Sequence, residues 1–286
     1  MMKKEKWLPY ALVSPYIIYF LAFVAFPVLF SVFLTFNEWN IISPMKFIGL
    51  ANYERLVQDA YFYKSLFNTL KFLLIHIPLQ IMVSLSLAYL LNQNLKFRGF
   101  FRAAFFVPVV VSGVVVTIMW QQIYGYDMGI LNQFLTWIGV GKIGWLIDQD
   151  IAMASIAVMA TWKNVGLYII LFLVGFQTVP PQYYEAADLE GASSWSKFWN
   201  ITLPMINPTI FMVVVLSTIG GFSLFIEPYV MTSGGPLNST LSTVLYIYKQ
   251  GFFYYHMGYS ATLGIVFAAI VMLVIMIQKR YVEKTN

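Results

Sequence analysis

Two groups of polar side chains could do chemistry in this otherwise apolar chain. Lys163 and Asn164 are adjacent in the middle of a long apolar run, where an ammonium and an amide can donate hydrogen bonds to hydroxyl groups or anions. Glu185 and Asp188 belong to a polar stretch, residues 177–207, between two apolar runs. These residue types favour binding over catalysis, because neither group includes a nucleophile with an adjacent base.

The sequence lacks the motifs of common catalytic and metal sites. It has no cysteine and only two histidines, His76 and His256, so it offers no thiolate site and no cluster of metal ligands. Lys142 follows Gly141, but Ile143 comes next, so no phosphate-binding loop is present. We therefore expect a non-catalytic chain that has no cofactor of its own and cannot hydrolyse ATP. A lone His76 is expected to be a packed interface residue.

The composition indicates that lipid is the solvent of this protein. Of its 286 residues, 60% are hydrophobic and only 10% are charged, against roughly 25% charged in soluble domains. Its apolar runs are each near the ~20 residues that cross a bilayer core. We expect an all-α integral membrane protein, a six-transmembrane-helix bundle that forms a single domain over residues 1–286. The expected spans cover about residues 9–36, 66–91, 103–124, 152–176, 208–230 and 259–278.

The distribution of Lys and Arg predicts which side each loop faces. With the N-terminus inside, ten of the 17 Lys and Arg residues fall in inner segments, five fall in outer segments, and Lys71 and Lys163 lie within spans. Basic residues accumulate on the cytoplasmic side, so we expect both termini and the 177–207 loop to be cytoplasmic. This bias explains the net charge of +5, and no basic stripe with interleaved aromatic residues indicates nucleic-acid binding.

The 177–207 loop is predicted to fold as two short helices joined at a glycine. Pro180-Pro181 suits the first turn of a helix, and Gly191 can end that helix in a left-handed conformation. Ser193 or Ser194 can cap a second short helix. The predicted shape is therefore a helix–Gly–helix elbow.

The predicted elbow is more apolar than a free cytoplasmic loop needs to be. Ala186 and Ala187 leave a low-profile patch on which another protein could pack closely. Larger apolar side chains surround this patch: Tyr183, Leu189, Trp195, Phe198 and Trp199. Such a patch is typical of a docking surface, although an amphipathic hairpin lying on the membrane explains the same pattern. The residue pattern alone leaves both interpretations open.

Lys163 is the only basic residue deep in a predicted span. It lies about 16 Å along the helix from residue 152, at 1.5 Å per residue. A charge at that depth costs at least ~2.5 kcal/mol, which favours a side chain facing the bundle interior or an aqueous path over one that snorkels outward. Glu227, near the outer end of the fifth span, is expected to be an interfacial carboxylate two or more helical turns away from the depth of Lys163.

Small residues recur on one face of the fifth span. Ser217, Gly221 and Leu224 fall at i, i+4 and i+7, which places them on the same side of a helix. Small residues in membrane helices most often let another helix approach closely, so spacing alone favours a packing role.

The 177–207 loop resembles the EAA loop of ABC importer permeases. The resemblance rests on Glu185-Ala186-Ala187, on Gly191 four residues later, and on Ile201-Thr202-Leu203-Pro204. The family usually has Asp-Gly-Ala where this chain has Glu190-Gly191-Ala192, a conservative departure. In that family the loop is a coupling helix that docks into a cleft of a cytoplasmic ATPase. The resemblance thus implies an ATPase-coupling role for Glu185, Ala186, Ala187, Asp188, Gly191, Leu203 and Pro204.

A second stretch is similar to the sugar-importer branch of that family, and more narrowly to its maltose- and glycerol-phosphate-type first permease subunit. It runs from Tyr229 to Pro236 and continues with Thr240 and Tyr246-Ile247-Tyr248, while Trp162-Lys163 fits the same group. Permeases of this kind hold sugar midway across the membrane with the fourth and fifth spans. The implied substrate path comprises Lys163, Asn164, Ser217, Gly221 and Leu224.

The resemblance also implies the partners of the chain. A permease of this type pairs with a second related permease, two copies of an ATPase that bind ATP and Mg²⁺, and an extracytoplasmic solute-binding protein, in the bacterial cytoplasmic membrane. Glycerol phosphate or another non-sugar solute is the alternative substrate. An ion-coupled secondary transporter is the less favoured class, because it would need paired repeats and several intramembrane carboxylates, and Glu227 is the one candidate.

Overall fold

A computed structural model describes residues 8–93 and 96–283, and helices make up most of this part of the chain. The chain divides into two compact units. One contains the residues up to 62 together with 246–270, and the other contains residues 63–245 with those from 271 onward. The helices α4, α14 and α15 each run from one unit into the other.

The first unit begins with a long apolar helix and continues through a hairpin. The elements are α1 (Leu8–Phe20), a π-helical turn (Leu21–Ala25), α2 (Phe26–Leu34), β1 (Asn37–Glu38), β2 (Lys46–Phe47), α3 (Ala51–Val57), the start of α4 (Ala60–Asn92), the second half of α14 (Thr243–Tyr248), a second π-helical turn (Lys249–Phe253) and the first half of α15 (Met257–Glu283). The two strands pair antiparallel, with Asn37 opposite Phe47 and Glu38 opposite Lys46.

A half-buried carboxylate joins the helices of this first unit. Asp59 precedes α4 and accepts hydrogen bonds from the backbone amides of Tyr61 (2.9 Å) and Phe62 (3.2 Å), as an N-cap does. Its other oxygen accepts from the hydroxyls of Tyr246 (2.5 Å) and Tyr259. One side chain therefore fixes the start of α4 against α14 and α15.

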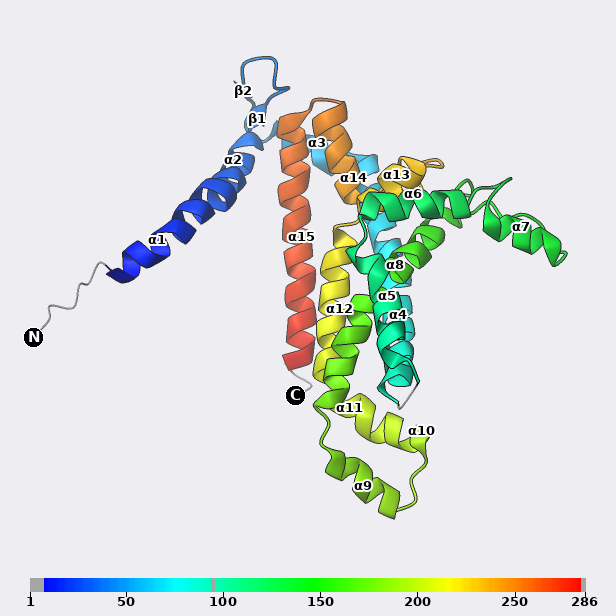
Figure 1. The fold of residues 1–286 in the computed structure, drawn as a ribbon. Coiled ribbons are helices and arrows are strands. Elements are labelled where there is room, and N and C mark those ends of the chain that lie inside the picture. The colour runs from blue at the N-terminus through cyan, green and yellow to red at the C-terminus, as the bar shows by residue number, and fades with distance from the viewer. Residues whose placement is uncertain (1–7, 94–95, 284–286) are drawn as a thin grey trace, which may run out of the picture. The chain divides into compact units, whose positions relative to one another are not determined.

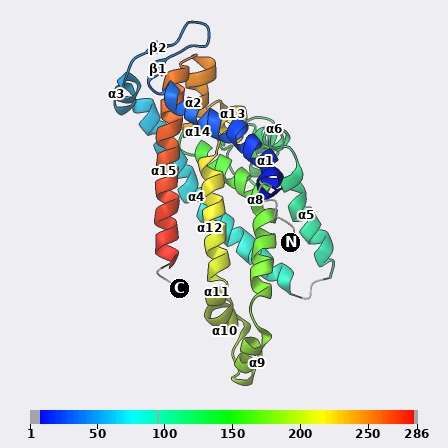
Figure 2. The ribbon, with the colours of Figure 1, turned by 90° about the vertical axis from the view of Figure 1, so that its left-hand side faces the viewer.

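The second unit holds most of the remaining helices. They are α5 (Arg98–Val110), α6 (Gly113–Ile123), α7 (Ile130–Trp137), α8 (Ala152–Gln177), α9 (Pro181–Leu189), α10 (Ser194–Lys197), a π-helical turn (Phe198–Thr202), α11 (Leu203–Met205), α12 (Asn207–Phe222) and α13 (Ile226–Thr232). Figures 1 and 2 show α8 and α12 side by side, with α9, α10 and α11 gathered at the end where α8 stops and α12 begins.

Helix α8 forms the centre of the second unit. In its apolar window 61% of the residues are buried, compared with 6% in the window of the first span, Tyr10–Leu34. Close approach of α12 to α4 depends on Gly221, because a Cβ there would collide with the side chain of Leu73. The glycine therefore serves helix packing, as its spacing predicts.

Among the residues that the structure describes, four helices are long and apolar enough to cross a membrane, and each of two bent pairs makes a further candidate. The straight candidates are Tyr10–Leu34, Ala60–Asn92, Ala152–Gln177 and Met257–Arg280. A multi-pass helical membrane protein, the coarser part of the sequence prediction, is confirmed.

Two of the expected spans differ from the prediction. The 103–124 run is broken into α5 and α6, which meet at 100°. Val111 and Ser112 between them have extended backbone (ψ 144° and 129°), so the helical hydrogen bonds stop there. The 208–230 run ends at Phe222, after which α13 is a separate helix, and α12 is itself bent by 66° from the segment Ser194–Met205.

Candidate functional site

The 177–207 loop folds as the elbow that its sequence predicts. Pro180 precedes α9 and Pro181 is its first residue. Gly191 has φ +73°, and its amide donates to the carbonyl of Asp188 (3.1 Å). The hydroxyl of Ser193 then accepts from the amide of Ser196 (3.2 Å) and caps α10. The left-handed glycine turns the chain by closing the last turn of α9, so that two short helices follow each other in an elbow.

Side-chain contacts fix the two arms of the elbow to each other. The Lys197 ammonium lies 2.5 Å from Asp188 Oδ1, which joins α10 to α9. The Tyr184 hydroxyl is hydrogen-bonded to Thr202 Oγ1 at 2.8 Å, which joins α9 to the segment before α12. These contacts therefore connect the elbow to the start of the long helix α12.

One face of α9 is buried and the other is free. Ala187 is buried, whereas Glu185, Ala186 and Asp188 are exposed. Leu189 is 91% exposed, and Trp195 on α10 is also exposed. Most of the apolar side chains that the sequence singles out are exposed, whereas Ala187 is buried and Phe198 is half-buried. We call the exposed set the elbow surface: Tyr183, Ala186, Leu189, Trp195 and Trp199.

The end of the coupling motif lies at the base of the elbow. Leu203 is half-buried and Pro204 is exposed, and both belong to α11. They connect the elbow to α12 rather than contribute to the elbow surface. The structure therefore separates the motif into an exposed part on α9 and a connecting part on α11.

Lys163 forms an ion pair with Glu227, a contact that the sequence allowed but favoured less than an interfacial carboxylate. Its Nζ lies 3.8 Å from Glu227 Oε1, and the two side chains are only 15% and 13% exposed. The expected separation of two or more helical turns is wrong, because the fifth helix ends at Phe222 and α13 packs back against α6 and α8. Lys163 Nζ also lies 2.8 Å from where a side chain on Gly113 would begin, so it covers the break between α5 and α6.

The other expected path residues do not gather around this pair. Asn164 donates to the carbonyl of Ala160 on its own helix (2.9 Å). Ser217 is fully buried, and Gly221 contacts Leu73 of α4. Leu224 lies beyond the end of α12 in a buried apolar cluster. Lys163 and Glu227 are thus the polar groups that meet, whereas the small residues lie in helix contacts.

Sequence reasoning missed the role of Glu227, but a signal for it exists. Gly220, Gly221 and Ser223 are all poor helix formers, and together they mark the end of α12. If these residues are taken as the end of the helix, Glu227 no longer has to continue along the axis of α12, and a contact with Lys163 becomes possible.

The side chains at these sites offer groups for binding. Within residues 8–93 and 96–283, no group of three or more His, Asp or Glu side chains could hold a metal ion. The elbow surface offers apolar contact at one end of α8, and the Lys163–Glu227 pair offers a charged donor and acceptor partway along it.

Solved structures of known proteins share the fold. The crystal structure of a bacterial ABC transporter involved in the import of the acidic polysaccharide alginate has a chain with a TM-score of 0.82 and 24% identity, and the match covers 97% of this chain and 96% of that one. The structure of a bacterial alginate ABC transporter in complex with an alginate pentasaccharide-bound periplasmic protein gives a TM-score of 0.81 at 24% identity, covering 95% and 92%.

Curated relatives match nearly the whole chain. The probable ABC transporter permease protein YurN of Bacillus subtilis is 36% identical, over 98% of this chain and 98% of YurN. The arabinooligosaccharides transport system permease protein AraP of the same organism is 36% identical, over 96% of this chain and 88% of AraP. The trehalose/maltose transport system permease protein MalF of Thermococcus litoralis is 32% identical, over 89% and 85%.

The family model described as binding-protein-dependent transport system inner membrane component matches residues 80–285. This range includes both the elbow and the Lys163–Glu227 pair. The chain therefore belongs to the family of inner-membrane permease components of binding-protein-dependent ABC transport systems, and it is a non-catalytic membrane subunit of such a system.

Proposed function

We propose that the chain is the transmembrane permease subunit of an ATP-driven sugar importer and that it docks its ATPase through the elbow surface. The observation that carries the proposal is this uncovered apolar face on α9 and α10, next to the ends of both α8 and α12. A partner that binds the elbow and moves it would displace the ends of α8 and α12 together. The coupling residues would be Glu185, Ala186, Ala187, Asp188, Gly191, Leu203 and Pro204.

A carbohydrate is the substrate class that the relatives favour. Their names include arabinooligosaccharides, trehalose/maltose and lactose. The Lys163–Glu227 pair supports a neutral solute, because the carboxylate compensates the ammonium that would otherwise attract an anion. Glycerol phosphate is thereby less favoured than a neutral sugar. Lys163 and Asn164 would donate to sugar hydroxyls, with Ser217, Gly221 and Leu224 shaping the helix contacts around them.

The proposal includes the assembly and its orientation. The chain acts as a single permease domain of six spans, the third and fifth of them bent, with both termini and the elbow in the cytoplasm of a bacterium. A second related permease supplies the other half of the path, two ATPase copies bind ATP and Mg²⁺, and an extracytoplasmic solute-binding protein delivers the sugar.

Reconstitution of the importer tests the proposal. The chain would be co-purified with the products of neighbouring genes, placed in liposomes with ATP inside, and supplied outside with labelled maltose, trehalose, lactose or arabinotriose and the binding protein. We expect ATP-dependent accumulation of at least one of these sugars. Failure of all four, or uptake that continues without the ATPase, would contradict the proposed function.

A further inference from the structure

A pocket of about 450 Å³ lies at the end of α8 opposite to the elbow. It is formed by the segment after α6, by residues 145–147 just before α8, and by the end of α13 with the Gly-Gly-Pro stretch that follows it. A volume of this size suits a small ligand. The sequence analysis singled out that stretch for its resemblance to sugar permeases, yet neither the elbow nor the Lys163–Glu227 pair uses it.

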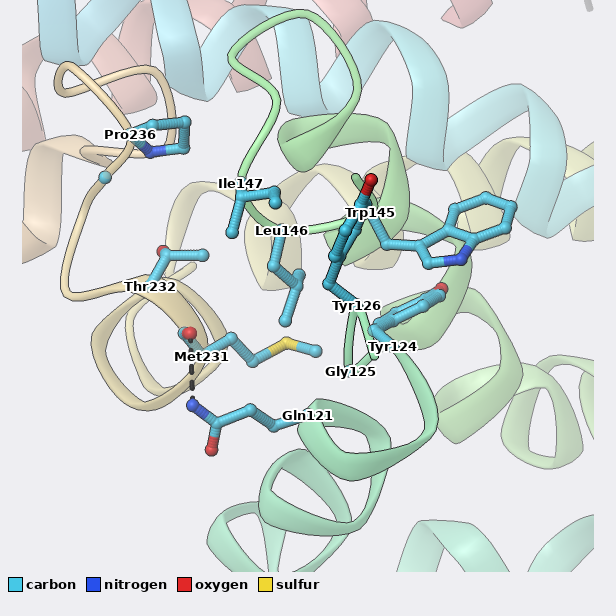
Figure 3. A pocket seen from close by; sticks show the side chains of 11 residues that line it. Gln121, Tyr124, Gly125, Tyr126, Trp145, Leu146, Ile147, Met231, Thr232 and Pro236 are labelled. Atoms are coloured by element: carbon cyan, nitrogen blue, oxygen red, sulfur yellow. Dashed lines mark hydrogen bonds between the residues drawn. The ribbon is translucent and has the colours of Figure 1, made fainter. Parts of the chain in front are cut away.

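Aromatic rings make one wall of the pocket. Figure 3 shows Tyr124, Tyr126 and Trp145 on one side and Met231, Thr232 and Pro236 across from them. The rings of Tyr124 and Trp145 lie 5.7 Å apart at 33°. Tyr124 and Met231 are buried, whereas Tyr126 is 44% exposed. An apolar ring face can therefore be covered by a ligand that enters from outside.

The wall is held in place before any ligand arrives. Asn132 is fully buried and donates to the carbonyls of Tyr126 and Ile143, both at 2.9 Å, while its Oδ1 accepts from Trp145 Nε1 at 3.0 Å. Across the pocket, Gln121 Nε2 donates to the carbonyl of Met231 (3.2 Å) and ties α6 to α13. Such prior ordering lowers the entropic cost of binding.

The residues around the pocket indicate the class of ligand. None of its lining side chains is charged, and hydroxyl and amide groups of Tyr126, Thr232 and Gln121 lie among the apolar ones. A pyranose ring has an apolar C–H face that covers an aromatic ring and equatorial hydroxyls that need donors and acceptors. A neutral sugar matches this lining. The nearest cation, the Lys142 ammonium 5.4 Å from the Tyr126 ring centroid, is already paired with Asp127 and so offers little compensation to an acidic sugar.

We propose that this pocket is an outer subsite that binds one neutral pyranose ring of the transported carbohydrate before it reaches the Lys163–Glu227 pair. This inference rests on the proposed function. Helix α13 links the two places, because Met231 in the pocket follows Glu227 by about one helical turn. A sugar in the pocket would contact α13, the helix that carries the Glu227 carboxylate.

Two variants of the assembled importer test the subsite, each with a matched control. Tyr126→Ala removes a ring from the pocket, and Trp137→Ala removes an exposed ring from α7 outside the pocket. Ile147→Trp fills the pocket from an exposed position, and Ile130→Trp places the same bulk on α7. At sugar concentrations below saturation we expect uptake to fall about five- to tenfold in both pocket variants and to stay within about twofold in both controls.

A second measurement separates a sugar subsite from a protein contact. Association of the sugar-free solute-binding protein with each importer variant in nanodiscs should match that of the wild type. Unchanged uptake in both pocket variants would overturn the subsite while leaving the proposed function intact. Weakened association of the sugar-free binding protein would also overturn it, because the pocket would then receive a protein. A wild-type importer that accumulates no neutral sugar would overturn the proposed function and the subsite together.

Discussion

Gly191 decides the shape of the elbow through its backbone alone. Its φ of +73° is left-handed, and a side chain there would meet nothing within 4 Å. A leucine would therefore cost about 1–2 kcal/mol by conformation and nothing by collision. We expect Gly191→Leu to uncouple ATP hydrolysis from uptake, because the two arms would no longer meet at the same angle. The measurement is the ratio of ATP hydrolysed to sugar accumulated in proteoliposomes.

Asparagine provides the control at position 191, since it tolerates the left-handed region better than other residues with a side chain. Gly191→Asn should keep most of the coupled transport. If Gly191→Leu supports full ATP-driven uptake, the coupling role of the elbow is wrong.

The Lys163–Glu227 pair makes a prediction about coupling between two side chains. Both are mostly buried, so removing one leaves an uncompensated charge in a poorly solvated place. We expect Lys163→Met and Glu227→Gln each to lower the thermal stability of the purified complex. The double variant should recover part of that loss, with an interaction free energy on the order of 1–2 kcal/mol. Strictly additive losses in the four-variant cycle would contradict the ion pair.

At the residue scale, the sequence predicted what depends on local chemistry. The proline start of α9, the left-handed Gly191 and the Ser193 cap all follow from backbone preferences, and the structure confirms them. The partner of Lys163 could not be predicted in this way. Its identity depends on where α12 stops and how α13 packs, which is a tertiary matter.

The elbow surface makes a prediction at the scale of an element. Leu189 is 91% exposed, so replacing it with aspartate should leave the fold intact while placing a charge in an apolar contact. We expect Leu189→Asp to weaken co-purification of the ATPase at least about tenfold. Met128 in the loop after α6 is 83% exposed, so Met128→Asp is the matched control and should retain the ATPase. Equal retention by both variants would remove the elbow surface from the ATPase interface.

The junction between the second π-helical turn of the first unit and α15 makes a prediction about pH. Gln250 donates to Tyr246, so its Oε1 accepts from His256 Nδ1 at 2.9 Å. Burial and the nearby Arg55 hold the pKa of His256 below its ordinary value of 6.5, while Glu38 opposes them. A lowered pKa in the folded state means that protonation favours opening. The stability of this junction is therefore complete above about pH 6.5 and is lost as the pH falls below it.

Hydrogen exchange of segment 249–260 measures this loss. Between about pH 7.5 and about pH 5.5, exchange corrected for its intrinsic rate should accelerate in the wild type. His256→Gln, which cannot titrate, should remove the acceleration. Acceleration of the same size in His256→Gln would show that another group is responsible.

At the element scale, hydropathy predicted apolar runs but not their bends. No proline lies at the break, which falls at Val111 and Ser112. The nearest one, Pro108, is within α5, and the helix continues past it to Val110. Ser112 is the N-cap residue of α6, and Lys163 occupies the space above Gly113 where a side chain would otherwise stand. A window of mean hydropathy averages over such a break, because both sides of it are apolar.

At the scale of the whole molecule, the four straight candidate spans differ widely in how much of their surface the rest of the chain buries. Only 6% of the residues in the window of Tyr10–Leu34 are buried, although its hydropathy is among the highest of the candidates. Hydropathy therefore predicts that this helix crosses the membrane but says nothing about what covers it.

The orientation of the whole chain yields a prediction that its composition makes simple to test. The protein contains no cysteine, so any single introduced cysteine is the only target for a thiol reagent. Met128 and Leu189 are both highly exposed. Met128 precedes α8 in the chain and Leu189 follows it, and α8 is a helix of 26 residues that is about 39 Å long. We expect Met128→Cys to react with a membrane-impermeant maleimide in intact cells, and Leu189→Cys to react only after permeabilisation, because the excess of Lys and Arg places the elbow inside. The reverse pattern would invert the topology and exclude ATPase docking at the elbow. Labelling of both variants from one side would show that α8 does not cross the membrane.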